Sequence, residues 1–559
     1  MARCVLDVLV VLCLLLASSV LLAQQLPDLS GDSRLQRAVT IEHGGASLRD
    51  ILQDLSRQTG VSFRISSGVS AWRACVFVRK VPAALVMNAL ARTFDLSWRA
   101  SGEGYELYHS PEQKSRQEYK IRQTVARVKA EMQDALQRLA GQRSRDREDD
   151  NQIRSMLLSD GHLTAALHAL TEDEWQRVLR GSAVLIGMER IPLRLRRERA
   201  LVTTLIELYY NPLRSGWRLT RYNPAGLSSG SYGFGRREVS TRGHRLSALL
   251  LPAEASARIT DKPRNPQQVI IPEALLALAN AAGTGVVAEY YPLTMLPHVL
   301  TYMPSSAKEL LDALDSLYVY DVKRVGDLLL FSARQRVWHR LADIPRETMA
   351  RWMGEQDRFG LTFTTALEMW RLTELQRDAL EEWASFMSTR YQYDAPLRSQ
   401  LYSDMAQVVR ERDALTKAVA HLPVTARRNL LAGKPVAISL RNPATREAFL
   451  YASAQLPVAN ISEAWIQAVR EQRVHYGVRL ITPTPEGGVQ FNTVSRDARS
   501  LEEFRERIMA EGIMGTPHWF RVDAEVVHLR VGVGRQVIQS RQMEFRRYTP
   551  ASVQEQKLR

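Results

Sequence analysis

Residues 47–65, which read SLRDILQDLSRQTGVSFRI, decide how the first part of the chain folds. Ser47 and Asp50 have the spacing of a helix capping box. Apolar residues then repeat at the helical period, at Leu48, Ile51, Leu52 and Leu55. Gly60 is the residue type that commonly ends a helix in a left-handed conformation, and residues 61–65 alternate as a strand does. The stretch predicts a helix followed by a strand.

The following residues predict a second strand, a second helix and a hairpin. Residues 75–78 are apolar, and Pro82 suits the first turn of a helix over residues 83–93. Residues 96–99 and 105–108 read as two strands joined around Gly102 and Gly104. We therefore predict a small α/β module at 40–110, in the order helix, strand, strand, helix, strand, strand.

The same order returns at 265–335, as expected for an internal repeat. A helix is predicted over 272–282, with Gly283 after it and a strand at 286–290. A second helix, capped at Ser306, leads to two strands that flank Gly326, at 318–322 and 328–331. We expect each of the two modules to close its own sheet.

A third, degenerate copy is predicted at 460–535, followed by a tail at 540–559. Its expected helices are 462–472 and 500–510, and its expected strands are 478–481, 489–491, 519–522 and 526–529. The pattern favours a multidomain α+β fold.

Charge-rich segments with helical periodicity lie between the modules and are predicted to be helical arms, at 115–215 and 340–455. The first arm should end in an apolar helix, Ala200 to Tyr209. Both arms contain two leucines and a glycine at the same spacing, in residues 170–181 and 422–433. Residues 216–264 are expected to be a linker and irregular region, because 222–244 is rich in Gly, Ser and Arg.

The first module resembles the secretin and TonB short N-terminal domain over Ala46 to Tyr108. The likeness rests on core positions and one glycine: Leu48, Leu52, Leu55, Thr59-Gly60-Val61, Val76, Val81, Ala84-Leu85, Ala89-Leu90, Leu96, Trp98 and Tyr105. Residues 270–332 resemble it more loosely. The resemblance implies a periplasmic domain that contacts other proteins at an outer-membrane complex, without catalysis. The sequence after residue 340 lacks the repeated alternating strands of a secretin or receptor barrel, so we expect no transmembrane barrel.

The N-terminus predicts export from the cytoplasm. Arg3 is followed by an apolar run from Cys4 to Leu22, which suits a signal peptide of residues 1–23 cut after Ala23. An uncleaved membrane anchor is the alternative, because the run is close to the length that spans a bilayer. After cleavage Cys75 is the one remaining cysteine, which leaves no intramolecular disulfide and suits a small buried residue in a strand.

The net charge of +15 comes almost entirely from arginine. Arginine suits anionic partners, and the densest basic run is Arg194 to Arg199. This run reads either as a solvated helix start or as a docking site for anionic lipid or an acidic protein. Nucleic acid is not expected as a partner of an exported chain.

No residue pattern in the sequence predicts an active site. Histidines such as His43, His162 and His168 lack metal-ligand spacing. Glycines 230, 233, 235, 532 and 534 complete no nucleotide-binding motif, and the pairs Asp149-Asp150 and Glu381-Glu382 read as solvated surface. Tryptophans are expected in the core rather than in a sugar-binding platform, at 175, 352, 370, 383 and 465.

We therefore expect no catalytic, cofactor-binding or metal-binding residues. The first hypothesis is a non-catalytic cell-envelope scaffold that binds protein partners through module surfaces and sheet edges. The second is an accessory or sensor component of an outer-membrane secretion or uptake system. The third is a hydrolase with a cleft between modules.

Overall fold

The computed structural model describes residues 29–140, 161–187, 190, 205–223, 226–233, 249–263, 268–295, 302–317, 319–353, 359–391, 396–454, 456, 461–475, 477–483, 489–495 and 520–550. These residues form two units. Unit 1 comprises residues up to Lys120, Gly243–Tyr291 and Pro297–Arg336, and unit 2 comprises Ile121–Arg242, Pro292–Leu296 and Val337 onward. Helices and several small mixed sheets make up both units, which confirms the α+β fold class.

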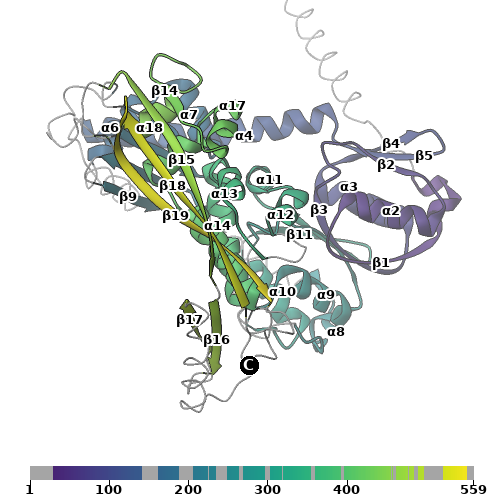
Figure 1. Ribbon diagram of the computed structural model, residues 1–559. Helices are drawn as coiled ribbons and strands as arrows, with labels where there is room; N and C mark the ends of the chain where they lie inside the picture. Colours follow the sequence, from purple (N-terminus) through teal and green to yellow (C-terminus); the bar gives the residue numbers. More distant parts are fainter. Residues whose placement is uncertain are drawn as a thin grey trace, which may run out of the picture. The chain divides into compact units, whose positions relative to one another are not determined.

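Unit 1 begins with two short helical turns and a strand, β1, that the sequence did not predict, and then has the elements predicted for the first module (Figure 1). In chain order they are η1 (Leu29–Gly31), η2 (Ser33–Gln36), β1 (Ala38–Ser47), α2 (Leu48–Thr59), β2 (Phe63–Ile65), β3 (Arg73–Pro82), α3 (Ala83–Phe94), β4 (Ser97–Ser101) and β5 (Gly104–Tyr108). Ser47 caps α2 by accepting a hydrogen bond from the Asp50 amide, and Gly60 ends it at φ 76°. The capping signals in the sequence therefore place both ends of this helix.

The second stretch of unit 1 also has the predicted order, preceded by a short helix, α8, within the predicted linker. Its elements are α8 (Pro252–Ala255), α9 (Ile271–Ala282), β10 (Gly285–Glu289), α10 (Ala307–Ser316), β11 (Tyr320–Val325) and β12 (Leu328–Ala333). Strand pairing follows one scheme in both stretches. β2 is parallel to β5, which is antiparallel to β4; β10 is parallel to β12, which is antiparallel to β11.

The prediction that each stretch closes its own sheet is wrong. A five-stranded sheet in the order β1-β3-β10-β12-β11 contains strands from both stretches, while β2-β5-β4 form a smaller sheet. The join is the antiparallel pairing of β3 with β10, in which Val76 lies opposite Val287. β3 carries five consecutive buried residues, Ala74 to Val78, so both its faces and both its edges are covered. A strand with so apolar a sequence needs two neighbours and two packed faces.

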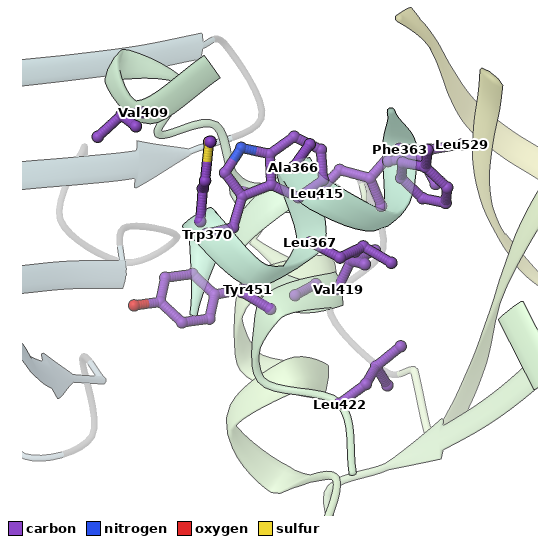
Figure 2. Packing of buried hydrophobic residues seen from close by; sticks show 14 of the residues in the cluster. Phe363, Ala366, Leu367, Trp370, Val409, Leu415, Val419, Leu422, Tyr451 and Leu529 are labelled. Atoms are coloured by element: carbon purple, nitrogen blue, oxygen red, sulfur yellow. The ribbon is translucent and has the colours of Figure 1, made fainter. Parts of the chain in front are cut away.

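Unit 2 contains most of the helices. After α4 (Pro111–Ala140), which begins in unit 1, the elements are α6 (Gly161–Ala169), α7 (Glu172–Leu179), α11 (Arg336–Ala342), α12 (Arg346–Met353), α13 (Phe363–Trp370), α14 (Glu374–Tyr391), α15 (Pro396–Arg410), α16 (Ala414–Ala420), α17 (Val424–Leu431) and α18 (Arg446–Ser453). α13 lies in the middle of the larger core, where Phe363, Leu367 and Trp370 pack with residues of α16, α18 and a neighbouring strand (Figure 2).

Three sheets belong to unit 2. The strands are β6 (Val184–Ile186), β7 (Leu205–Asn211), β8 (Gly216–Asn223), β9 (Gly226–Gly233), β13 (Phe359–Gly360), β14 (Val436–Ser439), β15 (Glu463–His475), β16 (Gly477–Pro483), β17 (Val489–Ser495), β18 (Phe520–Val533) and β19 (Gln536–Pro550). Their orders are β6-β7-β8-β9, β13-β19-β18-β15-β14 and β16-β17. The long strands β15, β18 and β19 lie side by side (Figure 1).

Several predictions for this unit are wrong. Residues 205–209, expected at the end of an apolar helix, lie in β7, so the arm predicted at 115–215 is not wholly helical. The linker predicted at 216–264 contains β8 and β9. The helix expected at 462–472 is β15, in which Ala464, Ile466 and Ala468 are buried at the strand period of two. The tail expected at 540–559 continues β19 as far as Pro550.

The described residues of the third module therefore form antiparallel strands in two sheets, with β15 and β18 in one and β16 and β17 in the other. Strands 478–481 and 489–491 are confirmed as β16 and β17, but 519–522 and 526–529 fall in one strand, β18, apart from residue 519. The predicted helix at 500–510 and residue 519 lie outside the described residues. Burial on alternate residues of β15, at Ala464, Ile466 and Ala468, favours a strand over a helix there.

Candidate functional site

The main concentration of charge in the interior of unit 2 lies on one face of the sheet β6-β7-β8-β9. All seven residues of β7 are buried. Ile206, Leu208 and Tyr210 face an apolar core built with α4, α6 and α7. The alternate residues, Glu207, Tyr209 and Asn211, face helices α14, α16 and α18. β7 therefore packs against apolar side chains on one face and against charged side chains on the other.

Eight charged side chains meet on that side, and we call them the ion cluster. They are Glu207, Arg218, Glu374, Arg377, Asp378, Glu381, Arg412 and Lys417. Four carry positive charge and four carry negative charge, so the cluster is neutral when all are ionised. Balanced pairing is what allows charges to remain in a protein interior, because an unpaired buried ion costs several kcal/mol.

Glu374 is the centre of the cluster and is 3% exposed. Its carboxylate binds the Lys417 ammonium, lies 3.1 Å from Arg377 Nη1 and 3.3 Å from Arg412 Nε, and also pairs with Arg218. Burial by itself would raise the pKa of Glu374. The charges of Lys417 and the three arginines outweigh burial and hold this pKa well below its usual range.

Lys417 joins the strand to the helices. Its ammonium lies 3.1 Å from Glu207 Oε2 and also binds Glu374, and the side chain is 4% exposed. Desolvation lowers the pKa of Lys417, while the two carboxylates oppose that change. Glu207 also accepts hydrogen bonds from the Tyr451 hydroxyl and, at 3.4 Å, from the Tyr222 hydroxyl. Its position is set by groups from β8, α16 and α18.

Arg377 and Asp378 extend the cluster toward other parts of the unit. Arg377 is 1% exposed, and its guanidinium donates to two carbonyls at the C-terminal end of α15, those of Val409 at 2.8 Å and of Glu411. Asp378 accepts from Asn211 Nδ2 at 3.2 Å and from Arg412 Nη2 at 2.9 Å. Every charged side chain of the cluster thus has a partner within the protein. The arrangement suits holding elements together and leaves each carboxylate neutralised by a cation.

The sequence reasoning missed this cluster. Glu381 and Glu382 are partly exposed, as expected of a solvated surface, but they are paired: Glu381 with Arg410 at 3.0 Å and with Arg412 at 3.4 Å, and Glu382 with Arg214. A single glutamate within the apolar run LIELYYN and a single lysine within ALTKAVA were the available signals. A lone charge in so apolar a segment predicts burial with a partner, but its sequence position does not identify that partner.

A smaller buried polar group lies in unit 1 around Glu289, which is fully buried. Its carboxylate accepts from the Ala333 amide at 2.6 Å, from Arg336 Nε at 2.8 Å and from the Tyr291 hydroxyl at 3.2 Å. Arg336 also donates to the Thr93 carbonyl at the end of α3. The group therefore ties β10, β12 and α3 together.

Cys75 lies in β3, as predicted, and is buried. Burial raises the pKa of its thiol far above the usual range, and a backbone contact with Gly45 offsets this only in part. Because the thiolate is the nucleophilic form, a thiol in this setting is inert. This agrees with the interpretation of Cys75 as a small buried residue.

The other residues singled out from the sequence are not brought together. His43 lies at the surface of unit 1, with Nε2 3.1 Å from Asp54 Oδ2, and His168 is exposed on α6. Gly230 and Gly233 lie in β9, and Gly532 and Gly534 lie in β18 and in the turn after it. Gly532 packs so closely on Trp465 that a Cβ there would lie 2.6 Å from the indole ring. Gly235, Asp149, Asp150, Arg194–Arg199 and the side chain of His162 lie outside the described part of the chain.

The tryptophans occupy core positions, as predicted for most of them. Trp175, Trp352 and Trp370 are buried, and Trp383 is packed against the larger core. Trp370 donates from Nε1 to the Val408 carbonyl at 3.0 Å. Among the described residues, no group of three or more histidine, cysteine or carboxylate side chains could hold a metal ion. No described helix is both long and apolar enough to cross a bilayer.

Comparison with known proteins identifies no relative of this chain. No protein-family model, no curated protein and no solved structure matches the sequence or the fold.

Proposed function

We propose that the protein is a non-catalytic, exported component of the cell envelope that binds other proteins through unit 1. Export is supported by residues 1–23, which have the arrangement of a signal peptide. The resemblance of residues 46–108 to the secretin and TonB short N-terminal domain favours protein contacts as the role of this part. The neutral, internally paired ion cluster of unit 2 suits a structural role better than a catalytic one.

The observation that carries the proposal is the difference between strand edges in unit 1. β1, at one end of the five-stranded sheet, is blocked at Thr40. There the Gln58 side chain accepts from the Thr40 amide at 2.9 Å and donates to the Thr40 carbonyl at 2.8 Å. Two irregularities in its pairing with β3 further distort this edge. Side chains and bulges of this kind prevent a foreign strand from pairing.

β11, at the other end of that sheet, carries charge along its length. Asp321 and Lys323 are exposed, and Arg324 pairs with Glu254 at 2.6 Å while donating to the Leu249 carbonyl. Charged side chains on an edge strand disfavour pairing with another chain. Both ends of the larger sheet are therefore protected.

β4, at the end of the smaller sheet, is less protected. Its five residues, SWRAS, contain no lysine or proline and pair with β5 in a regular register, and their single charged side chain, Arg99, pairs with Glu106 of β5 at 2.7 Å. Ser101 lies opposite Gly104 across a two-residue turn, so this pair and every second pair beyond it are hydrogen-bonded to β5. The backbone groups of Trp98 and Ala100 then face away from β5. This edge is suited to accept an extended segment of a partner as an additional strand.

Proline at Ala100 tests this proposal. Ala100→Pro removes an outward N–H while leaving the pairing with β5, and Ala100→Val keeps the N–H at the same exposed position. Envelope extracts would be cross-linked to each full-length variant, and the captured proteins quantified by mass spectrometry. We expect a partner captured by the native chain and by Ala100→Val to be lost with Ala100→Pro, with unchanged circular dichroism for all three. Equal capture by the two variants, or no specific capture by the native chain, would reject the proposal.

A further inference from the structure

Among the described residues, the two halves of the chain share many structural features, including backbone details that the sequence does not show, although no strand of the second half matches β1 or β3. In unit 1, the first amide of α3, at Ala83, donates to the Arg37 carbonyl at 3.0 Å. The first amide of α10, at Ala307, donates to the Ala257 carbonyl at the same distance. Arg258 and Ser306 form an isolated β-bridge just before α10. This bridge has the position before α10 that the β1–β3 pairing has before α3.

The glycines of unit 1 also correspond. Gly60 and Gly283 end α2 and α9 with φ values of 76° and 62°. Gly102 and Gly326 occupy the turns of the hairpins β4–β5 and β11–β12, with φ values of 60° and 58°. Positive φ at these positions is required by the same helix end and the same turn in each half.

Unit 2 repeats in the same way. α7 and α17 both have eight residues and end in the same hydrogen bonds: Ser182 N to Arg177 O at 3.1 Å, and Lys434 N to Asn429 O at 3.0 Å. The helices are followed by Gly181 and Gly433, both with positive φ. A short strand then opens a sheet of successive antiparallel strands, β6-β7-β8-β9 in one half and β14-β15-β18-β19 in the other.

Each unit therefore contains one part from each half, and the halves meet inside both units. In unit 1 they meet where β3 pairs with β10, over Ala74 to Phe77. In unit 2 they meet in the ion cluster, where Glu207, Asn211 and Arg218 of the first half bind Lys417, Asp378 and Glu374 of the second. The β3 edge and the charged face of β7 and β8 are thus surfaces that fit another copy of the same architecture.

We infer that the chain is a dimer fused in tandem, in which each half carries a docking surface for the other. The partner that fits these two surfaces is a second copy of the half-chain fold. The first half ends and the second half begins between Gly233 and Leu249. Non-covalent contacts hold the two halves together as much as the covalent link does. Two domains that followed each other along the chain would not share a sheet and a set of buried ion pairs.

Cutting the link in the folded full-length protein tests the inference. A protease recognition sequence with flexible flanks would be inserted after Gly233, the protein cleaved to completion, and the second half captured through a C-terminal tag. We expect the first half to be retained in equal amount in native buffer and to be released by urea. Release of the first half in native buffer at physiological salt would overturn the inference.

A variant of the ion cluster tests whether specific contacts, rather than entanglement of the two chain segments, hold the cleaved halves together. In the cleaved protein, Lys417→Met should release the first half at a lower urea concentration than the native sequence. Arg214→Ala, which removes a more exposed pair with Glu382, should shift the release much less. Equal release by the two variants would remove the ion cluster from the docking surface and overturn that part of the inference.

Discussion

Replacing Lys417 with methionine should destabilise unit 2 strongly. Lys417 is 4% exposed and is the cation that Glu207 and Glu374 share. Methionine preserves much of the aliphatic volume, so the main loss is electrostatic. Glu374 keeps three arginine partners, but Glu207, 1% exposed, is left with tyrosine hydroxyls alone. Breaking a buried pair by removing one partner costs about 3–5 kcal/mol, and we expect a loss in that range.

Urea unfolding combined with hydrogen exchange of peptides from β7 and α16 would measure this loss locally. Local measurement is needed because a chain of two units does not have to unfold in one transition. Arg214→Ala is the matched control, since its side chain is 60% exposed and its pair with Glu382 should contribute about 1 kcal/mol or less.

Adding Glu207→Gln to Lys417→Met tests the cause of the loss. The double variant should recover part of the stability, because it replaces an unpaired buried carboxylate with a neutral amide. If Lys417→Met costs no more than Arg214→Ala, or if Glu207→Gln adds fully to its cost, the reasoning about the buried charge is refuted.

Two further predictions concern single groups. Cys75 should resist alkylation by iodoacetamide at pH 8 in the folded protein, because burial raises the pKa of its thiol, and should react once urea unfolds unit 1. Labelling would be measured by mass spectrometry, and rapid labelling of the native protein would contradict this prediction. Glu174 should stabilise α7 less as the pH falls: burial acts against ionisation, but Arg190 and the Thr171 cap lower its pKa to about 2, from an unfolded value near 4.5. Its contribution to stability is therefore complete above about pH 4.5 and disappears as the pH approaches 2. The difference in unfolding free energy between the native chain and Glu174→Gln should shrink over that interval. A difference that stays constant would exclude the pairing of Glu174 with Arg190.

Most elements of unit 1 were predictable because local signals mark them, although β1 and the short helix α8 were missed. Capping at Ser47 and Ser306 and the left-handed glycines Gly60 and Gly283 fix helix ends through contacts only a few residues apart. The pairing of β3 with β10 was not predictable, because the residues that meet are about two hundred positions apart and any apolar strand would suit either edge. The repeated order also suggested separate modules, which is the simpler arrangement of two similar sequences.

Unit 2 was harder to predict because its strands do not show the usual alternation. β7 is buried on both faces, so its leucines, tyrosines and isoleucine fit a buried helix as well as a strand. β15 contains Glu471, Arg470 and Gln467 among its small apolar residues, a composition that favours a helix. Pairing with β18 over most of its length overrides that preference. The ion cluster likewise depends on tertiary contacts, which place Glu207 and Lys417 together from distant positions.

Deamidation of Gln58 over time would change the edge of β1. A single neutral side chain occupies both the donor and the acceptor of Thr40 on β1. Deamidation converts this glutamine to glutamate, which has no N–H to give and places negative charge beside the Thr40 carbonyl. The carboxylate can still accept from the Thr40 amide, but the Thr40 carbonyl would lose its donor and be open to an N–H of another chain, so slow chemical damage at one surface residue would weaken the protection of this sheet edge.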